Sequence, residues 1–323
     1  MLSRRVVSGF AALAFAAAVH AGPAAAGALG EFNVLTFGDF TAPSSDVEGR
    51  LYAGGNVSLS NYSVGATLSG GLVGGDTLVV GGDLTFVSGS VNNGNAVVGG
   101  SAAGVDSSVR WGLINSGYTL TENVGAAGLP VDFTAEQVRL QTTSAALALL
   151  SATGVSEAKW SQVFLTGSGN AAREVFNISA ADLAGSTNLA ISGVQAGAEI
   201  IVNVSGSSAS WSGGLDSFFE QNRTNVIFNF FEAETLSLGS IGVQGSILAV
   251  NADISASWGV VWGQVVAESW NGPMQANNVS YGGTVPGFTP NPTTEVPAPA
   301  AAGVMIVGLF AFAGLRRRRA VKA

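Results

Sequence analysis

The sequence predicts an all-β protein with one flanking helix, and its short strands are best explained as coils of a β-solenoid. Three observations lead to this prediction. Glycine accounts for 45 of the 323 residues, whereas charged residues make up only 11%. Glycine pairs recur between short runs of apolar and β-branched residues, which suits strands joined by tight corners. One segment alone has a helical periodicity, and with 47% apolar residues the chain can bury a sizeable core.

Residues 50–104 carry an imperfect repeat of apolar strand residues, a glycine pair and a small polar residue, as in RLYAGGNVSL and LVVGGDLTF. Glycine adopts the positive φ of a tight corner and lets neighbouring backbones approach closely. Short strands with such corners favour a solenoid, and a β-sandwich with hairpins at the same glycines is the alternative. The pairs are Gly54-Gly55, Gly74-Gly75, Gly81-Gly82 and Gly99-Gly100.

Residues 134–153 are predicted to form the helix. Thr134 and Gln137 have the spacing of a capping box, and Gly154 lies just past the expected end. The Ala-rich surface suits close packing, so we expect the helix to lie along the side of the solenoid. The residues expected on its apolar face are Val138, Ala145, Ala146, Leu149 and Leu150.

Strands are predicted again after the helix, in VFNISAADL, NLAISGV, EIIVNVSG, NVIFNFFEA, TLSLGSI and GVQGSILAV. The apolar runs at residues 200–202 and 226–228 are typical of strands that are paired on both sides. Residues 284–299 are rich in Pro and Thr and have no periodicity. We therefore expect a semi-extended linker there.

The N-terminal residues 1–26 have the three parts of an export signal. Arg4 and Arg5 make a positive start, Val6 to Val19 an apolar middle, and small residues follow. Cleavage after Ala21 or Ala26 would suit the small-residue preference. The alternative is an N-terminal membrane anchor, although the apolar run is short for a membrane span.

The C-terminus carries a second apolar segment, Ala300 to Leu315, followed directly by four arginines. As a helix it would extend about 24 Å, enough to cross a locally thinned hydrocarbon core. Positive flanks stay on the cytoplasmic side, so the body is expected outside the cytoplasm. The tail is expected to cross the inner membrane at least transiently. The alternative is an ordinary, permanent C-terminal membrane anchor.

The order of parts at this end resembles the PEP-CTERM type of bacterial sorting signal. In that family an exosortase removes the tail, and the proteins serve surface or matrix roles in Gram-negative bacteria. Ala298 stands where the eponymous Pro-Glu-Pro has Glu, so the motif is closer to the Val-Pro-x-Pro-Ala variants. We assign residues 296–323 to the signal, with the motif and the arginine cluster at Val296, Pro297, Pro299, Arg316, Arg317, Arg318 and Arg319.

Charge and residue usage exclude several classes of function. Seven of the 13 Lys and Arg lie in the two ends, so residues 22–296 hold six basic residues against 21 acidic ones, a net charge of −15. That charge repels phosphate backbones, so we expect no nucleic-acid partner. The chain has no Cys, and its only His is His20 in the signal region. Thiol chemistry and Ser-His-Asp hydrolysis are therefore excluded, and we expect no cofactor.

The body resembles the choice-of-anchor A domain. The opening FNVLTFGDFTAPSSDVEGRLYAGGNVSLSNYSVG is similar to the start of that domain, and VFNISAADL, IIVNVSG, VIFNFFEA, VQGSILAVNADI and WGQVVAESWNG follow in the family's order. The resemblance covers roughly residues 30–283, and we place the domain at 27–283. It implies an adhesive domain built as a right-handed β-helix with a flanking helix, as in ice-binding-like proteins.

Two groups of residues are candidate sites. Asp39, Asp46 and Glu48 offer carboxylates for calcium, with an electrostatic cap formed by Asp46, Glu48 and Arg50 as the alternative. A tryptophan face can stack on a sugar ring. Gly259 and Gly263 make an intervening turn between the tryptophans plausible, so core packing remains the alternative to glycan contact. The tryptophans concerned are Trp258, Trp262 and Trp270.

The sequence is most consistent with an exported, non-catalytic surface adhesin that binds polysaccharide or a cell-surface component. A carboxylate-dependent enzyme on a β-helix is one alternative, with Asp216 and Glu220 or Glu232 and Glu234 as acid pairs. Ice binding is the other, and it would need a flat array of Thr or similar residues. Thr67, Thr77 and Thr85 are too irregular for that array.

Overall fold

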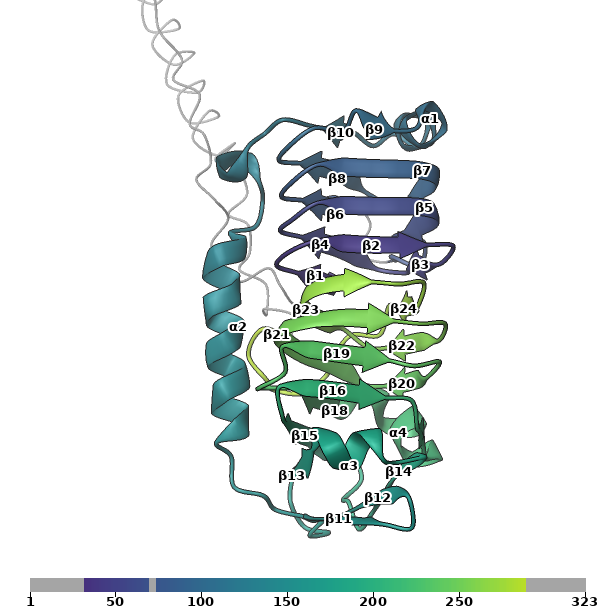
Figure 1. Ribbon diagram of the computed structural model, residues 1–323. Helices are drawn as coiled ribbons and strands as arrows, with labels where there is room; N and C mark the ends of the chain where they lie inside the picture. Colours follow the sequence, from purple (N-terminus) through teal and green to yellow (C-terminus); the bar gives the residue numbers. More distant parts are fainter. Residues whose placement is uncertain (1–31, 70–73, 289–323) are drawn as a thin grey trace, which may run out of the picture.

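The computed structural model describes residues 32–69 and 74–288. The expected signal peptide and sorting signal lie outside these residues. The described chain is mostly β, with one large, parallel sheet of 20 strands and a second sheet of four. The strands stack in layers along one axis, and a long helix runs beside the stack (Figure 1).

The first half of the chain runs from the middle of the stack to one end and then into the long helix. Its elements are β1 (Phe32–Thr36), β2 (Phe40–Pro43), β3 (Asp46–Val47), β4 (Arg50–Ala53), β5 (Val57–Val64), β6 (Asp76–Val80), β7 (Leu84–Val91), β8 (Asn95–Val98), β9 (Gly104–Val105), α1 (Ser107–Asn115), β10 (Leu120–Thr121), the 3-10 helix η3 (Ala126–Gly128) and α2 (Phe133–Ala148).

The second half starts at the far end of the stack and returns to the middle. Its elements are β11 (Val155–Lys159), β12 (Gln162–Thr166), β13 (Arg173–Ser179), α3 (Ala180–Ala184), β14 (Asn188–Ser192), β15 (Glu199–Ser205), β16 (Ser208–Trp211), β17 (Gly214–Leu215), α4 (Ser217–Asn222), the 3-10 helix η4 (Arg223–Asn225), β18 (Val226–Asn229), β19 (Thr235–Leu238), β20 (Gly242–Gln244), β21 (Ser246–Ala256), β22 (Val260–Trp262), β23 (Val265–Asn271) and β24 (Gln275–Asn277).

Each strand of the large sheet pairs in parallel with an equivalent strand one layer away, so the strands form ladders. The helix-side ladder joins β13, β15, β18, β21, β23, β1, β4, β6, β8 and β10. The open ladder joins β16, β19, β21, β23, β2, β5, β7 and β9. A third ladder joins β20, β22, β24, β3, β5 and β7. This parallel pairing is not the antiparallel arrangement of the sandwich alternative.

Apolar side chains form two buried layers. The larger layer lies between the ladders, inside the stack. The second lies between the outer side of the helix-side ladder and α2, and it includes Leu140 and Leu147 of the helix. Tyr281, Val285 and Phe288 also belong to this layer, and the Phe288 ring meets that of Phe32 edge-on at 6.0 Å. Packing therefore extends five residues into the segment that we expected to be a linker.

The helix α2 lies beside the stack as predicted, but its ends and its buried face differ from the prediction. The cap is Asp132, whose Oδ1 accepts a hydrogen bond from the Ala135 amide, and the helix ends at Ala148. The expected face was wrong because Val138 and Leu149 are 59% and 86% exposed. The residues that face the sheet follow a different helical stripe, and they are Glu136, Leu140, Ser144 and Leu147.

A ladder of asparagines attaches α2 to the sheet. Asn229 Nδ2 donates to Asn203 Oδ1 at 2.9 Å, and Asn203 Nδ2 donates to Asn177 Oδ1 at 3.1 Å. The same amides also donate to the carbonyls of Ser144 and Leu147 in the last turns of α2. The Ser144 hydroxyl donates to Asn229 Oδ1 at 2.6 Å, so these buried polar groups satisfy one another across the interface.

The glycine corners work through close approach rather than positive φ. A Cβ added to Gly54, Gly81 or Gly99 would stand 2.3, 2.1 and 2.3 Å from a carbonyl oxygen of the neighbouring layer. Only the pair Gly74-Gly75 has positive φ, at +86° and +65°, and it lies outside this column. Glycine is therefore required at these corners because the backbones of adjacent layers touch there.

The polar residues that follow Gly38, Gly55 and Gly82 form a ladder of their own. Asp39 Oδ1 accepts from the Asn56 amide at 2.7 Å, Asn56 Oδ1 from the Asp83 amide at 2.9 Å, and Asp83 Oδ1 from the Ser101 amide at 2.7 Å. Each side chain thus satisfies a backbone donor one layer away. This is the structural reason for the polar residue after the glycine pair at Asn56 and Asp83. Asp76, which follows Gly74-Gly75, instead accepts a hydrogen bond from Asn95 Nδ2 at 3.4 Å.

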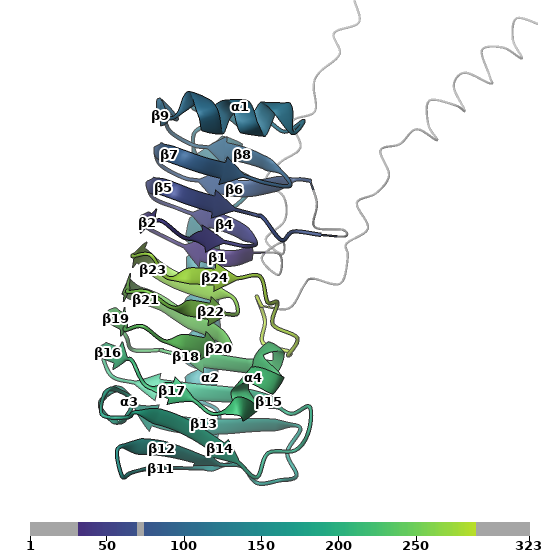
Figure 2. The ribbon, with the colours of Figure 1, turned by 90° about the vertical axis from the view of Figure 1, so that its right-hand side faces the viewer.

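Short helices that we did not predict complete the fold. The helix α1 covers one end of the stack with buried Val109 and Leu113 (Figure 2). The helix α3 follows β13 directly, capped by Ser179, inside the segment that we expected to be one strand. The prediction of a single helix was therefore incomplete, whereas the strands at residues 200–202 and 226–228 are paired on both sides as expected.

Glu199 fastens the last described residues to the stack. Its carboxylate accepts hydrogen bonds from the Tyr281 hydroxyl at 2.5 Å and the Thr284 amide at 2.6 Å, and it pairs with Arg173. Burial by itself raises the pKa of Glu199. The hydrogen bonds and the Arg173 charge outweigh burial, so its pKa lies below the ordinary 4.5.

We predict that Gly81→Ala destabilises the fold by about 1–3 kcal/mol, because its Cβ would overlap the Gly54 carbonyl. Urea unfolding measures the change. The matched control is Gly112→Ala on α1, where nothing lies within 4 Å of the new Cβ, and which we expect to be neutral or stabilising. Equal losses for both variants would contradict close approach as the reason for the glycine column.

We predict that Glu199→Gln lowers the free energy of unfolding at pH 7 by about 1–3 kcal/mol. The free energy of unfolding of this variant should also decrease less between pH 7 and pH 3 than that of wild type. A carboxylate with a depressed pKa stabilises the fold above its unfolded pKa and loses that contribution as pH falls through the folded value. Urea unfolding at pH 7, 5, 4 and 3 tests this. Glu220→Gln, at an exposed pair with Arg223, should behave like wild type. Parallel pH profiles for wild type and Glu199→Gln would contradict the prediction.

Candidate contact face

The outer side of the open ladder, called here the open face, presents a regular column of polar side chains. One residue from each layer stands in register with the next, and all seven are exposed. Adjacent strands lie about 4.8 Å apart, so the column repeats at that spacing. Its members, in order along the stack, are Ser210, Ser237, Ser255, Asn271, Thr41, Ser58 and Thr85.

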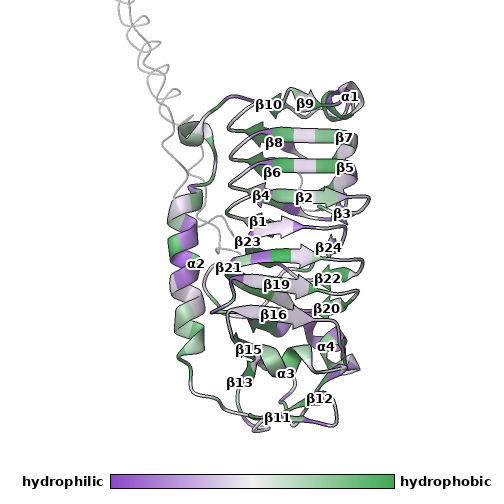
Figure 3. Ribbon diagram, viewed as in Figure 1, coloured by the Kyte–Doolittle hydropathy of each residue, from purple (hydrophilic) through white to green (hydrophobic). Residues whose placement is uncertain are grey.

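The column exists because side chains alternate between the two sides of a strand. The residue before each member points into the stack and is buried: examples are Leu236 before Ser237 and Val57 before Ser58. Seven separate chain segments contribute one residue each, and six of the seven carry a hydroxyl group. Figure 3 shows green and pale bands that alternate along β5 and β7, as this alternation requires.

A second, shorter column flanks the first in the half of the stack formed by β16, β19, β21 and β23. Its members Ser208, Thr235, Asp253 and Ser269 are also in register. The Thr235 hydroxyl donates to Ser208 Oγ at 2.9 Å, and Ser269 Oγ donates to Asp253 Oδ1 at 2.6 Å. These hydrogen bonds hold the hydroxyls in fixed directions, so the face offers ordered donors and acceptors with little charge.

The structure separates the three tryptophans that we considered as a platform for sugar rings, with core packing as the alternative. Trp270 is 2% exposed, stacks on Phe40 with ring centres 6.0 Å apart, and donates from Nε1 to the Gly272 carbonyl. The guanidinium group of Arg223 lies over Trp262, with Cζ 4.6 Å from the centre of the indole ring. Trp258 is 63% exposed before β22. Trp270 therefore packs in the core, and only Trp258 keeps a largely free indole.

The proposed calcium ligands are engaged in the fold. Asp39 accepts from the Asn56 amide, and Glu48 Oε2 accepts from the Asn278 amide at 2.9 Å. Asp46 is partly buried, which raises its pKa, and the Glu48 charge adds to the effect. Arg50 donates to the carbonyls of Gly74 and Asp76. Within residues 32–69 and 74–288, no three acidic or histidine side chains are spaced to hold a metal ion.

The carboxylates considered for catalysis make local contacts. Asp216 caps α4 by accepting from the Phe218 amide at 3.0 Å, and its other oxygen accepts from the Ile191 amide at 2.8 Å. Glu220 lies 3.5 Å from Arg223, and Glu232 accepts from the Gly206 amide at 2.7 Å. Each of these three carboxylates thus has a structural partner.

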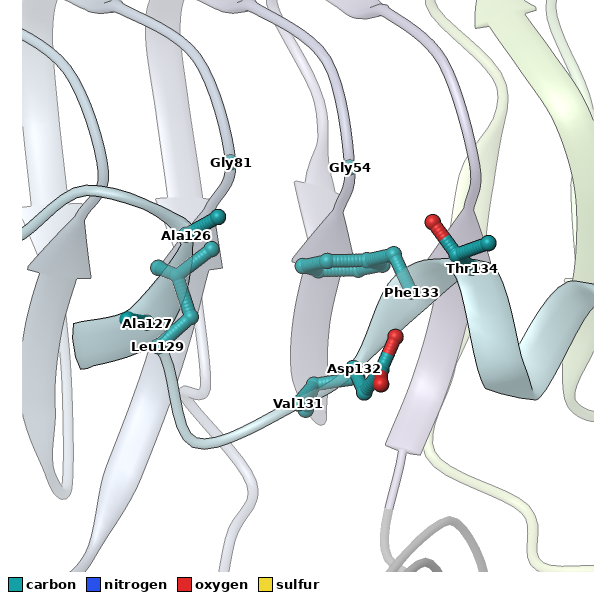
Figure 4. A pocket seen from close by; sticks show the side chains of 9 residues that line it. All are labelled: Gly54, Gly81, Ala126, Ala127, Leu129, Val131, Asp132, Phe133 and Thr134. Carbon is teal, nitrogen blue, oxygen red and sulfur yellow. The ribbon is translucent and has the colours of Figure 1, made fainter. Parts of the chain in front are cut away.

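A small groove of about 460 Å³ lies between the corners of the helix-side ladder and the segment that leads into α2 (Figure 4). Phe133 faces the corner at Gly54, and the Asp132 carboxylate is used to cap the helix. The groove is mainly apolar and offers few groups that could orient a polar ligand. Its lining residues are Gly54, Gly81, Ala126, Ala127, Leu129, Val131, Asp132, Phe133 and Thr134.

The threonines considered for ice binding do not form an array. Thr77 is fully buried, Thr67 follows the end of β5, and Thr85 alone stands on the open face. The column was not recognised in the sequence because its members are separated by 16 to 27 residues within each half of the chain and by 125 residues between the halves, and they share no motif. Only the strand register brings them together.

The sequence matches the family model described as "Putative Ice-binding-like adhesive domain" over residues 25–279. No curated protein matches the chain. Two solved structures resemble it weakly. An ice-binding protein from the Antarctic ascomycete Antarctomyces psychrotrophicus has 12% identity and a TM-score of 0.38, with coverage of 80% of this chain and 98% of that one. An ice-binding protein from an Antarctic Biological Consortium has 13% identity and a TM-score of 0.38, with coverage of 84% and 94%.

None of the helices in the described part of the chain is both long enough and apolar enough to cross a membrane.

Proposed function

The chain belongs to the ice-binding-like adhesive domain family, and from this premise we propose that it is an exported bacterial surface or matrix adhesin whose open face binds polysaccharide. The observation that carries the proposal is the column of seven exposed polar residues in register. An extended polymer with repeating hydroxyls would meet a matching repeat of donors and acceptors. The ladders would form a right-handed β-helix, since parallel crossovers are nearly always right-handed.

Charge favours a neutral ligand. The body carries a net charge of −15, so an anionic polymer would be repelled at low salt. The two columns of the open face include one carboxylate, Asp253, and no cation. A hydrogen bond from a single hydroxyl to the polysaccharide is weak. The seven layers of the column would make several such contacts at once, and display of many molecules on one surface would raise the overall avidity further.

Export and sorting complete the proposal. An export signal at residues 1–26 directs the chain across the inner membrane, and the tail at 296–323 holds it there until an exosortase-like enzyme acts. Support comes from the apolar segment, the arginine cluster and the Val-Pro-x-Pro-Ala order of the sequence. The body itself acts as a non-catalytic binding domain.

Ice binding is the second candidate, and the regular spacing of the column is the observation in its favour. A flat array at one repeat per strand could order water as well as a polymer. The column contains only two threonines, Thr41 and Thr85, and the flanking column carries a carboxylate. Polysaccharide therefore remains the ligand class that we favour.

We predict that a Ser58→Arg, Ser255→Arg double variant loses at least tenfold in binding to a neutral polysaccharide, because two bulky charges interrupt the flat face. Cosedimentation of the protein with cellulose, chitin and cross-linked dextran measures binding. Thr142→Arg on the exposed side of α2 is the matched control and should bind like wild type. Wild-type binding by the double variant would contradict the proposal. Ice recrystallisation inhibition without polysaccharide binding would favour ice, and shortened sugar products would favour an enzyme.

We predict that deletion of residues 296–323 releases the protein from the cell surface into the medium. Immunoblotting of cell and medium fractions measures this. Replacing Pro297 and Pro299 with Ala separates a processed signal from a permanent anchor. If the tail is normally removed, the substitutions should block its removal, and the mature protein should gain the mass of the tail. If the tail is a permanent anchor, the mass of the mature protein should change only by the substitutions themselves. Unchanged surface retention of the truncated chain would overturn the sorting proposal.

A further inference from the structure

The end of the stack opposite α1 carries an aromatic residue in an unusual place. The strands β11 and β12 form an antiparallel hairpin in which Lys159 pairs with Gln162 (Figure 2). Only Trp160 and Ser161 connect the strands, and their φ angles are +51° and +56°. Two positive φ angles define the type I′ turn, which strongly favours Asn-Gly. A bulky residue such as tryptophan is rarely found there.

The fold restrains this turn from one side. The Ser161 carbonyl accepts hydrogen bonds from the Thr187 amide at 2.7 Å and the Thr187 hydroxyl at 2.9 Å. These contacts fix the turn to the segment before β14. They compensate for the unfavourable backbone conformation but do not involve the indole ring, so they do not explain why tryptophan occupies the position.

Core packing does not explain the tryptophan either, because 81% of Trp160 is exposed. The indole is nevertheless held in a defined orientation. The Phe164 ring meets it edge-on at 6.2 Å, and Lys159 Nζ lies 5.0 Å from its centre and 5.1 Å from that of Phe164. Residues in backbone strain that have no packing role occur preferentially at binding sites.

The polar groups around the indole are arranged on the same side of the hairpin. Glu157 stands directly opposite Phe164, and its carboxylate pairs with Lys159 at 2.6 Å. The two charges cancel, so the surface has aromatic area and hydrogen-bonding groups without net charge. A neutral ligand with one apolar face and hydroxyls at its rim fits this combination, and a sugar ring has both features.

We propose that Trp160, with Phe164, Lys159 and Glu157, forms a binding site for one sugar ring of a neutral polysaccharide. The ring stacks on the free indole surface, and its hydroxyls bond to the Glu157 carboxylate and the Lys159 ammonium group. The site shares the ligand class with the proposed function, and to that extent rests on it, but uses no residue of the open face. This site would let the end of the stack bind a polysaccharide that does not contact the open face.

The test is Trp160→Asn in the full chain. Asparagine suits the type I′ turn, so the variant should unfold at the same temperature as wild type or higher, whereas its sugar site is removed. Titration with cellohexaose and chitohexaose, followed by tryptophan fluorescence and calorimetry, measures binding. We expect at least tenfold weaker binding for Trp160→Asn and partial retention for Trp160→Tyr.

Trp111→Asn on α1 is the matched control, because it removes an indole that is 63% exposed at the other end of the stack, and it should bind like wild type. The Ser58→Arg, Ser255→Arg variant should keep the Trp160-dependent signal, which separates this site from the open face. Equal binding by wild type and Trp160→Asn would overturn the proposal, as would the absence of binding of both sugars to wild type. A dimer in sedimentation that Trp160→Asn abolishes would also overturn it and identify a second copy as the occupant.

Discussion

The parallel pairing of β1 with β23 holds the two halves of the stack together. Val34 lies opposite Val265, and Phe40 stacks on Trp270 in the layer beside it. The Asn33 amide group donates to the carbonyls of Gly263 and Asn277, so polar side chains also bridge the joint. The chain completes this contact only after some 230 residues, through α2 and the whole second half. The continuity of both the core and the open face depends on it, because β2 continues the ladder that β23 ends.

The column on the open face takes one residue from each layer, so its regularity requires a constant spacing between the layers. The glycine column sets that spacing, because any side chain there would push adjacent backbones apart. The Asp39, Asn56 and Asp83 ladder then fixes the register, since each side chain bonds to the backbone one layer away. On the helix side the asparagines from Asn177 to Asn229 do the same and add the contact with α2. The polar ladder at the corners and the asparagine ladder beside α2 thus help to keep the polar column in register.

Local patterns predicted the strands, the glycine corners and the presence of α2, because these depend on neighbours in sequence. The residues that line the open face could not be predicted, since seven distant segments contribute one residue each and only the register aligns Ser210 with Thr85. The buried stripe of α2 was misassigned because Glu136 and Ser144 face the sheet, where polar partners satisfy them. Trp270 and Trp258 look alike in sequence, but one lies inside a ladder and the other at a corner. The strained turn at Trp160 carries no sequence signal, because tryptophan is not a turn residue.

The contact between Phe32 and Phe288 has a mechanical consequence. The first and last described residues leave the body together, at its waist and on the side of α2, rather than at opposite tips. A force applied to the chain beyond Phe288 would therefore reach the stack near its middle, close to the joint between the two halves, and not at a terminal layer. A load between that point and either end of the stack would bend the joint between β1 and β23 before it separated the terminal layers.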